Sequence, residues 1–335
     1  MQASPVPSEC SVQASAVPSE CSVNASRTPI TSTQIKSARI GKFKKPVLSP
    51  IPSECSMSTP IKIPSDVDNS FNKDVRYSLE VWVPADNDRL SRNLNVTDRN
   101  ILKTKEWLNE TIIDASMSLL KFQFPDMHGL QSCCRAGDLS FERHSGLFIQ
   151  IINRTPHGNG SHWITVSNVK ALDITNQVTV YDSAFQDLPE DEGMVIASLV
   201  DIEGNILHVQ LANVQMQRNT HDCGLFAIAN ATTLAFGKNP VNQTYDSTKM
   251  RSHLIKCLEN KEITPFPTTK FSGKRSPVKR TVDVEIFCVC RMPDTRTLYI
   301  FCDECGREYH PACVQIEHEI TDSMVFICPI CKSRK

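Results

Sequence analysis

The chain has 335 residues, and 36 lysines and arginines against 37 aspartates and glutamates give a formal net charge of −1, so direct nucleic-acid binding is not expected. The sequence shows neither a signal peptide at its start nor an apolar stretch long enough to cross a bilayer, which predicts a soluble intracellular protein without a membrane partner. In such a reducing compartment, the 14 cysteines are expected to be metal ligands or nucleophiles rather than disulfides.

Residues 1–74 are predicted to form a disordered tail. They are rich in Ser, Pro, Thr and Ala and have hardly any aromatic side chain, which leaves too little apolar surface to offset the entropy of ordering. Segments 2–12 and 13–23 are near copies, and proline in every copy argues against a solenoid. Duplication of this repeat explains the cysteines of the tail, Cys10, Cys21 and Cys55.

Residues 75–267 are predicted to form an α+β domain, because helical and strand-like patterns alternate along them. A helix is expected after the N-cap residue Asn109, where apolar residues follow helical spacing up to Pro125. Runs of β-branched residues predict strands at 147–152, 163–169, 177–181 and 206–214. Two further helices are expected at 225–234 and 248–258.

Four residues of this domain have the chemistry of a thiol protease. Cys223 precedes a predicted helix, whose N-terminus favours a thiolate. His162 opens one predicted strand and Asp182 follows the next, so neighbouring strands can present an imidazole and an orienting carboxylate together. Gln217 lies six residues before Cys223 and can supply an oxyanion-hole amide. The alternative for Cys223 is a buried structural cysteine.

Other histidines and cysteines compete for these roles. His157, His208 and His221 are candidate bases, but His221 is too close along the chain to Cys223 to face it readily. We therefore favour His162. Structural or core positions are expected for the remaining thiols of the domain, Cys133, Cys134 and Cys257.

Together with the segment Trp107–Ile113, these residues resemble the ubiquitin-like-protein-specific (SUMO) protease family over roughly residues 81–258. The resemblance implies a papain-like fold with permuted order, in which His162, Asp182 and Cys223 are the triad and Gln217 the oxyanion residue. In that family two tryptophans, matched by Trp107 and Trp163, form a tunnel that admits only a Gly-Gly tail. Flat indoles exclude a Cβ, so specificity comes from rejecting side chains. No cofactor is expected in this domain.

A basic linker is predicted at residues 268–282, with a nuclear-import signal as the alternative. A zinc module is predicted at residues 283–335. Seven cysteines and one histidine occur there as closely spaced pairs, which suits two tetrahedral zinc ions. So short a segment needs the metal in order to fold. The eight candidate ligands are Cys288, Cys290, Cys302, Cys305, His310, Cys313, Cys328 and Cys331.

The ligand spacing and Tyr309 before the histidine resemble a PHD finger, with a RING finger as the minor alternative. The resemblance implies an interleaved cross-brace, with Cys288, Cys290, His310 and Cys313 on one zinc and the other four ligands on the second. It also implies a histone tail as partner.

Some PHD fingers enclose a methylated lysine in an aromatic cage. Phe287 and Tyr299 stand at cage positions, but Glu308 replaces an aromatic residue there. A carboxylate favours an ammonium that still donates hydrogen bonds, so an unmodified or lowly methylated lysine is the expected ligand. Asp303 can add an acidic contact to a basic tail.

The sequence thus predicts a nuclear cysteine protease, with an additional cytoplasmic location as the alternative. It is expected to cleave after the C-terminal glycine of a ubiquitin-like modifier such as SUMO, in processing or isopeptide removal, with a zinc finger that reads a histone tail. Two alternatives remain. One is a viral-like or mobile-element-encoded proteinase of the same fold, and the other is a non-catalytic chromatin-binding module.

Overall fold

The structure is a computed structural model that describes residues 80–86, 88–154, 162–169, 176–270, 273, 275–291, 299–316, 321 and 324–334. The chain divides into two units, Met1–Gly41 and Lys42–Lys335. The predicted tail, residues 1–74, lies outside the described residues, and every element below belongs to the second unit. None of the helices described here combines the length and apolar character needed to cross a membrane.

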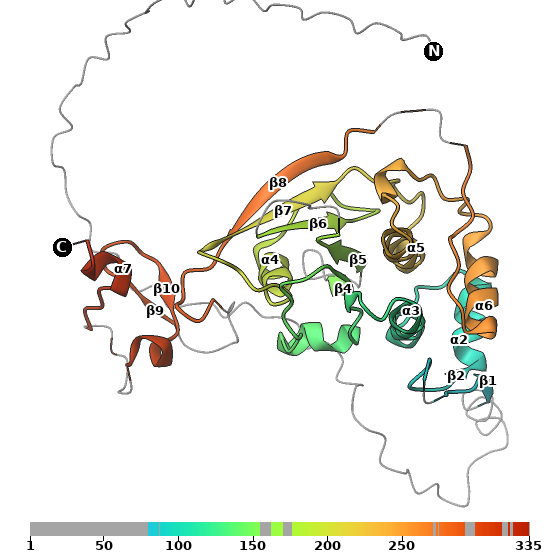
Figure 1. The fold of residues 1–335 in the computed structure, drawn as a ribbon, viewed down its shortest axis with the longest axis horizontal. Coiled ribbons are helices and arrows are strands. Elements are labelled where there is room, and N and C mark those ends of the chain that lie inside the picture. Colours follow the sequence, from blue (N-terminus) through green and yellow to red (C-terminus); the bar gives the residue numbers. More distant parts are fainter. Residues whose placement is uncertain are drawn as a thin grey trace, which may run out of the picture. The chain divides into compact units, whose positions relative to one another are not determined.

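A six-stranded sheet forms the centre of the predicted α+β domain (Figure 1). Its strands lie in sequential order, β3-β4-β5-β6-β7-β8. The pairs β3–β4 and β6–β7 are parallel and the other neighbours are antiparallel. The strands are β3 (His128–Gly129), β4 (Phe148–Arg154), β5 (His162–Ser167), β6 (Gln177–Tyr181), β7 (Ile206–Ala212) and β8 (Val278–Glu285).

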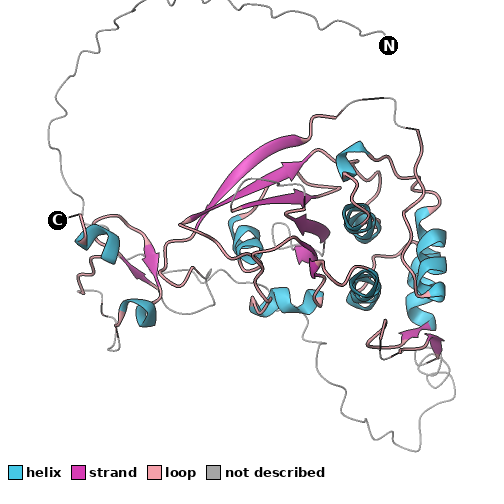
Figure 2. Cartoon of the chain, in the orientation of Figure 1, coloured by secondary structure: helices cyan, strands magenta, loops and turns pink. Residues whose placement is uncertain are grey.

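Helices cover both faces of this sheet (Figure 2). Buried residues of α2, α3, α5 and α6 form one apolar cluster with Ile149 and Ile151 of β4. On the other face, Ile196 and Ala197 of α4 join a second cluster with the strands. The helices are α2 (Val96–Thr104), α3 (Glu110–Gln123), α4 (Glu190–Ala197), α5 (Cys223–Ala235) and α6 (Met250–Asn260).

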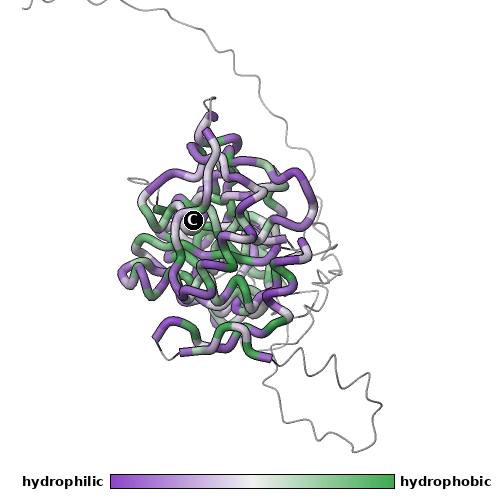
Figure 3. The backbone as a smooth tube through the Cα atoms, turned by 90° about the vertical axis from the view of Figure 1, so that its right-hand side faces the viewer, coloured by the Kyte–Doolittle hydropathy of each residue, from purple (hydrophilic) through white to green (hydrophobic). Residues whose placement is uncertain are grey.

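The central strands are buried along their whole length because both faces are covered. Every residue of β5 and β6 is buried, which explains why these strands read as nearly continuous apolar or β-branched runs. Figure 3 shows the same division, with hydrophobic stretches gathered inside the trace and hydrophilic ones around it. The predicted α+β class is confirmed, and each predicted strand is found within about two residues of its expected position.

The predicted N-cap of α3 is confirmed: the Asn109 side chain accepts a hydrogen bond of 3.0 Å from the Ile112 N–H. Two of the helices that pack on the central sheet, α2 and α4, were not predicted. α2 begins after Asn95, which forms a capping box with Asp98, so a start signal was present in the sequence. α4 crosses between the parallel strands β6 and β7, which cannot be joined by a tight turn.

The predicted basic linker is wrong for its last residues, because β8 occupies Val278–Glu285. This strand pairs antiparallel with β7 and forms an edge of the sheet. It is largely exposed, and Val284 is its buried residue. Lys279 and Arg280 are exposed on the strand, as charged residues commonly are at a sheet edge, and this explains why the segment looked like a solvated linker.

The remaining elements are short. Two-stranded pairs are formed by β1 with β2 and by β9 with β10. These elements are β1 (Val81–Val83), β2 (Leu94–Asn95), β9 (Ile300–Phe301), β10 (Glu308–Tyr309), the 3-10 helices η1 (Cys133–Asp138), η3 (Pro240–Asn242) and η4 (Pro311–Val314), and α7 (Pro329–Lys332).

Candidate active site and metal clusters

The sheet brings His162 and Asp182 together. His162 is the first residue of β5, and Asp182 directly follows β6. Because these strands are antiparallel neighbours, the start of one lies beside the end of the other. The His162 Nε2 and Asp182 Oδ1 atoms are 2.7 Å apart, and both residues are buried. The predicted imidazole–carboxylate pair is therefore present.

The Asp182 carboxylate is surrounded by donors. Oδ1 also accepts hydrogen bonds from the backbone N–H groups of Ala184 and Phe185, at 2.7 and 3.0 Å. Oδ2 accepts one of 2.6 Å from Arg154 Nη1. Burial alone would raise the pKa of Asp182, but the hydrogen bonds from His162 and the two backbone groups hold it below its usual value. The carboxylate is thus ionised and fixed in orientation.

Arg154 was missed by the sequence analysis. It ends β4, stands opposite His162 in the β4–β5 register, and its side chain is 1% exposed. Its Nε lies 2.6 Å from Glu192 Oε2, so two buried carboxylates neutralise one buried guanidinium. A charged residue at the end of an apolar strand was the available signal.

Cys223 is the first residue of α5, as predicted, and is buried. Its thiol lies close enough to the His162 ring to influence the charge of that ring. Burial by itself would lower the pKa of His162, but the hydrogen bonds with Asp182 and Cys223 raise it to about 9. Because Asp182 contacts Nε2, Nδ1 is the ring nitrogen left for the thiol. The residues 162, 182 and 223 therefore form one connected constellation.

Gln217 is tied to the residue that follows Asp182. Its backbone N–H donates to the Ser183 carbonyl at 2.7 Å, and its Oε1 accepts from Ser183 Oγ at 2.8 Å. Its Nε2 donates to the Asn219 carbonyl at 2.6 Å, which leaves the second amide proton for another acceptor. This side chain thus lies in the same part of the domain as the triad residues.

The two tryptophans have different environments. Trp163 is 3% exposed, and its indole N–H donates to the Leu108 carbonyl at 2.9 Å. Trp107 is 47% exposed. Leu108 also contacts the start of α5: a Cβ on Gly224 would lie 2.9 Å from the Leu108 Cβ. The segment that bears Trp107 therefore packs directly beside the residue that follows Cys223.

The competing residues lie elsewhere. His208 pairs with Asp283 across β7 and β8 at 2.8 Å, and His221 Nε2 is 3.9 Å from Asp222 Oδ1. His157 lies outside the described residues. Cys257 is buried, as expected for a core position, but its Sγ lies 3.4 Å from His253 Nε2, a second thiol–imidazole pair that the sequence analysis did not identify.

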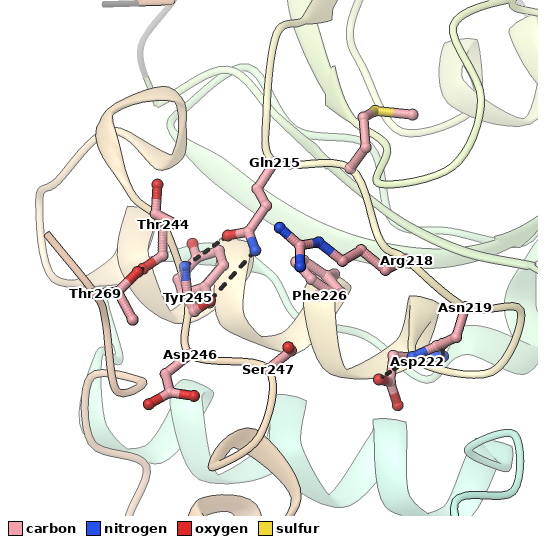
Figure 4. A pocket seen from close by; sticks show the side chains of 11 residues that line it. Gln215, Arg218, Asn219, Asp222, Phe226, Thr244, Tyr245, Asp246, Ser247 and Thr269 are labelled. Atoms are coloured by element: carbon pink, nitrogen blue, oxygen red, sulfur yellow. Dashed lines mark hydrogen bonds between the residues drawn. The ribbon is translucent and has the colours of Figure 1, made fainter. Parts of the chain in front are cut away.

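A pocket of about 200 Å³ lies beside the chain segment that carries Gln217 (Figure 4). Gln215 spans it, with its amide bonded to the backbone of Tyr245 at 2.6 and 3.3 Å. Asp222 contributes to the wall, whereas Cys223 does not. The pocket is therefore a neighbour of the triad rather than its cleft.

The eight predicted zinc ligands gather into two groups of four, within each of which the ligand atoms lie within 4.8 Å of one another. In the first, His310 Nδ1 is 3.1 Å from Cys288 Sγ, 3.3 Å from Cys290 Sγ and 3.9 Å from Cys313 Sγ. Three thiols and one imidazole, or four thiols, are donor sets that suit zinc. The second group consists of Cys302, Cys305, Cys328 and Cys331.

The predicted histone-contact residues are engaged within the chain. The Arg307 guanidinium lies 4.6 Å from the Phe287 ring centroid, and the Tyr299 ring stacks on His310 at 5.3 Å. Asp303 Oδ2 accepts a hydrogen bond of 2.7 Å from the Phe326 N–H. Glu308 is in β10. One face of the predicted cage residue Phe287 is thus already in contact with a cation of the same chain.

Comparison with known proteins identifies the C-terminal module. Residues 288–331 match the family model described as PHD-finger. The COMPASS component SPP1 of Saccharomyces cerevisiae is 33% identical over 61 residues, which are 18% of this chain and 16% of that protein. The match therefore spans only about a sixth of the relative's length.

The mixed α/β architecture resembles that of the Ulp1 protease. A structure of the C-terminal Ulp1 protease domain in complex with Smt3, the yeast ortholog of SUMO, covers 60% of this chain and 99% of its own, at 16% identity and a TM-score of 0.37. A structure of Ulp1 with its catalytic cysteine oxidised to a sulfenic acid covers 58% of this chain and 96% of its own, at 16% identity and a TM-score of 0.41. The Chaetomium thermophilum Ulp1-like SUMO protease catalytic domain covers 58% of this chain and 90% of its own, at 17% identity and a TM-score of 0.34. Similarity at this level does not establish an activity.

Proposed function

We propose that this chain is a cysteine peptidase that cleaves after the C-terminal glycine of a ubiquitin-like modifier such as SUMO. The observation that carries the proposal is the set of Cys223, His162 and Asp182, in which the imidazole lies 2.7 Å from the carboxylate and its pKa responds to the thiol at the start of α5. A nucleophile, a base and an orienting group that lie together are the parts that covalent peptide hydrolysis needs.

The chemistry follows from these contacts. Cys223 Sγ attacks the glycine carbonyl while its proton is held by the His162 ring. The imidazolium then gives this proton to the departing amine as the C–N bond breaks, which leaves a thioester. Water attacks the thioester with His162 as base, and the thiol and the free carboxylate are restored. Gln217 and backbone N–H groups are proposed to stabilise the oxyanion.

Electrophilic probes that place a reactive group at the C-terminal glycine of SUMO, a NEDD-type modifier or ubiquitin test this proposal. The parent protein is expected to gain the mass of at least one probe. Cys223→Ser is expected to gain none, whereas Cys257→Ser, which removes a thiol that lies beside the His253 imidazole in the same domain, is expected to react like the parent.

The same panel separates the alternatives. A parent protein that reacts with no modifier probe but cleaves other peptides would support a proteinase with a different substrate. A parent that binds a modifier without forming an adduct would contradict the peptidase proposal and support a binding module.

We further propose that each cluster of the finger holds one zinc ion and that the finger binds a histone tail, which would place the protein in the nucleus. Support comes from the PHD-finger match and the two four-ligand clusters. Glu308 and Asp303 add negative charge, while the Phe287 ring is in contact with Arg307. These features favour an unmodified or lowly methylated lysine over a trimethylated one.

Titration of histone-tail peptides with zero to three methyl groups on the lysine tests the choice. Affinity is expected to fall as methyl groups are added, since each removes a donor. Glu308→Trp is expected to shift the preference toward the trimethyl form, whereas Glu308→Gln removes the charge without adding a ring. A parent protein that prefers the trimethyl peptide contradicts the proposal.

A further inference from the structure

Arg251 connects three chain segments next to the candidate active site. It lies in the first turn of α6, and its side chain is 12% exposed. Its Nη1 donates a hydrogen bond of 2.9 Å to the Ile101 carbonyl. Ile101 is in the last turn of α2, where the backbone carbonyls have no N–H donor from the helix itself. Nη2 donates to the Glu106 carbonyl at 2.8 Å and to the His221 carbonyl at 3.3 Å.

The guanidinium also holds the residue before the nucleophile. Arg251 Nε and Nη2 lie 3.1 and 2.9 Å from Asp222 Oδ1. The other carboxylate oxygen, Oδ2, accepts from Asn219 Nδ2 at 2.7 Å, and Asn219 Oδ1 accepts from the Asp222 N–H at 3.0 Å (Figure 4). The turn that leads into Cys223 is thus fixed from two sides.

The same guanidinium holds the backbone carbonyl that precedes the exposed Trp107. Glu106 and Leu108 flank Trp107, and residues 105–109 lie outside any helix or strand. The carbonyl before Trp107 is held by Arg251, and the carbonyl after it by the Trp163 indole N–H. This segment has no ladder of backbone hydrogen bonds, so these two side chains hold the carbonyls on either side of Trp107, while Asn109 at the end of the segment is bonded to Asp98.

We propose that Arg251 is a positioning residue that sets the separation between Trp107 and Cys223, and so how strictly the site demands glycine in the substrate tail. This inference rests on the proposed function. Only a planar fork with several donors can reach two carbonyls on one side and a carboxylate on the other, so lysine is not an adequate replacement. If the fork is removed, the indole can move away from the nucleophile and admit a Cβ.

The test compares two substrates in the full-length protein, one whose tail ends in Gly-Gly and one with alanine in place of the penultimate glycine. In Arg251→Met, the preference for Gly-Gly in kcat/KM is expected to fall roughly tenfold, since shifts of about 1 Å at a site cost up to ~100-fold in rate. Arg251→Lys, which keeps the charge, is expected to restore little of it. A loss of stability alone would slow both substrates equally and leave the ratio unchanged.

Arg99→Met is the matched control. Arg99 also joins α2 to α6, through an ion pair of 2.9 Å with Glu259, but it contacts neither the Trp107 segment nor the Cys223 turn. The ratio of kcat/KM for the Gly-Gly substrate to kcat/KM for the alanine substrate is expected to be the same in Arg99→Met as in the parent. An unchanged ratio in a folded Arg251→Met protein would overturn the proposal.

A second measurement does not depend on catalysis. Amide hydrogen exchange in segments 105–109 and 219–223 is expected to accelerate together in Arg251→Met and Arg251→Lys, and to stay at the parent rate in Arg99→Met. Unchanged exchange in both segments would refute the positioning role. If the parent reacts with no modifier probe, the proposed function fails, while this exchange result still decides whether Arg251 holds the two segments.

Discussion

The charge on His162 connects the chemistry of the site with its stability. Burial of the imidazole opposes its charge, but contacts with Asp182 and Cys223 outweigh burial and raise its pKa to about 9, from about 6.5. Because the folded value exceeds the unfolded one, the imidazolium stabilises the fold fully below about pH 6.5. This contribution is lost as the pH rises through about 9.

The free energy of unfolding is therefore expected to fall between pH 6.5 and pH 9, by up to about 3 kcal/mol. Urea unfolding at several pH values measures this slope. His162→Gln is expected to reduce the slope, whereas His221→Gln, an imidazole in the adjacent turn, is expected to keep it. The value of kcat/KM should also decline above about pH 9, where the ring no longer carries the proton for the leaving amine. A stability profile that is flat across this range would contradict the assignment.

At the level of single residues, sequence reasoning named candidate residues that the fold brings together, but not the groups that hold them. His162, Asp182 and Cys223 carry chemistry that their residue types and neighbouring strands indicate. Arg154 and Arg251 act through contacts with residues distant in the sequence, which become neighbours only when β4, β5 and α6 pack. A spacing rule cannot identify such contacts, because they depend on the tertiary fold.

Among the elements, β8 differs most from the sequence-based expectation. Most of its residues are exposed and several are charged, so its one buried side chain, Val284, was not recognised as a core residue. Val284 packs closely on α4, because a Cβ added to Gly193 would lie 2.9 Å from Val284 Cγ2. Val284 and Ile286 belong to the apolar cluster on the α4 face of the sheet. The strand is therefore part of the hydrophobic core of the α+β domain, although it lies in the sequence next to the finger.

Val284→Asp is accordingly expected to destabilise the α+β domain by roughly 3 kcal/mol or more, because it places a carboxylate in an apolar cluster. Thr281→Asp changes an exposed residue of the same strand and is expected to cost less than about 1 kcal/mol. Urea unfolding followed by tryptophan fluorescence reports this domain alone, since all three tryptophans, Trp82, Trp107 and Trp163, precede residue 288. Equal transitions for the two variants would show that β8 is not part of this core.

At the scale of the whole molecule, the order of the modules could be predicted because each has its own local signal. Cysteine pairs indicate a metal module whatever surrounds them, and the four-ligand groups of the structure agree with that prediction. The predicted border between the α+β domain and the finger was misplaced because an edge strand needs only one apolar face. The outward-facing residues of β8 resemble those of a linker. Nothing in residues 268–282 indicates that this segment supplies the strand that pairs with the free edge of β7.

One consequence of β8 concerns how far the α+β domain can reach from the finger. Only Ile286 and Phe287 separate the end of the strand from Cys288, the first ligand of the finger. Such a connection spans at most about 10 Å, far less than a flexible tether of fifteen residues would allow. If the finger is anchored to a ligand, the α+β domain with its proposed peptidase site would stay in the immediate vicinity, at an effective concentration in the millimolar range. Substrates beside the anchoring point would then be processed repeatedly, while those a few nanometres away would escape.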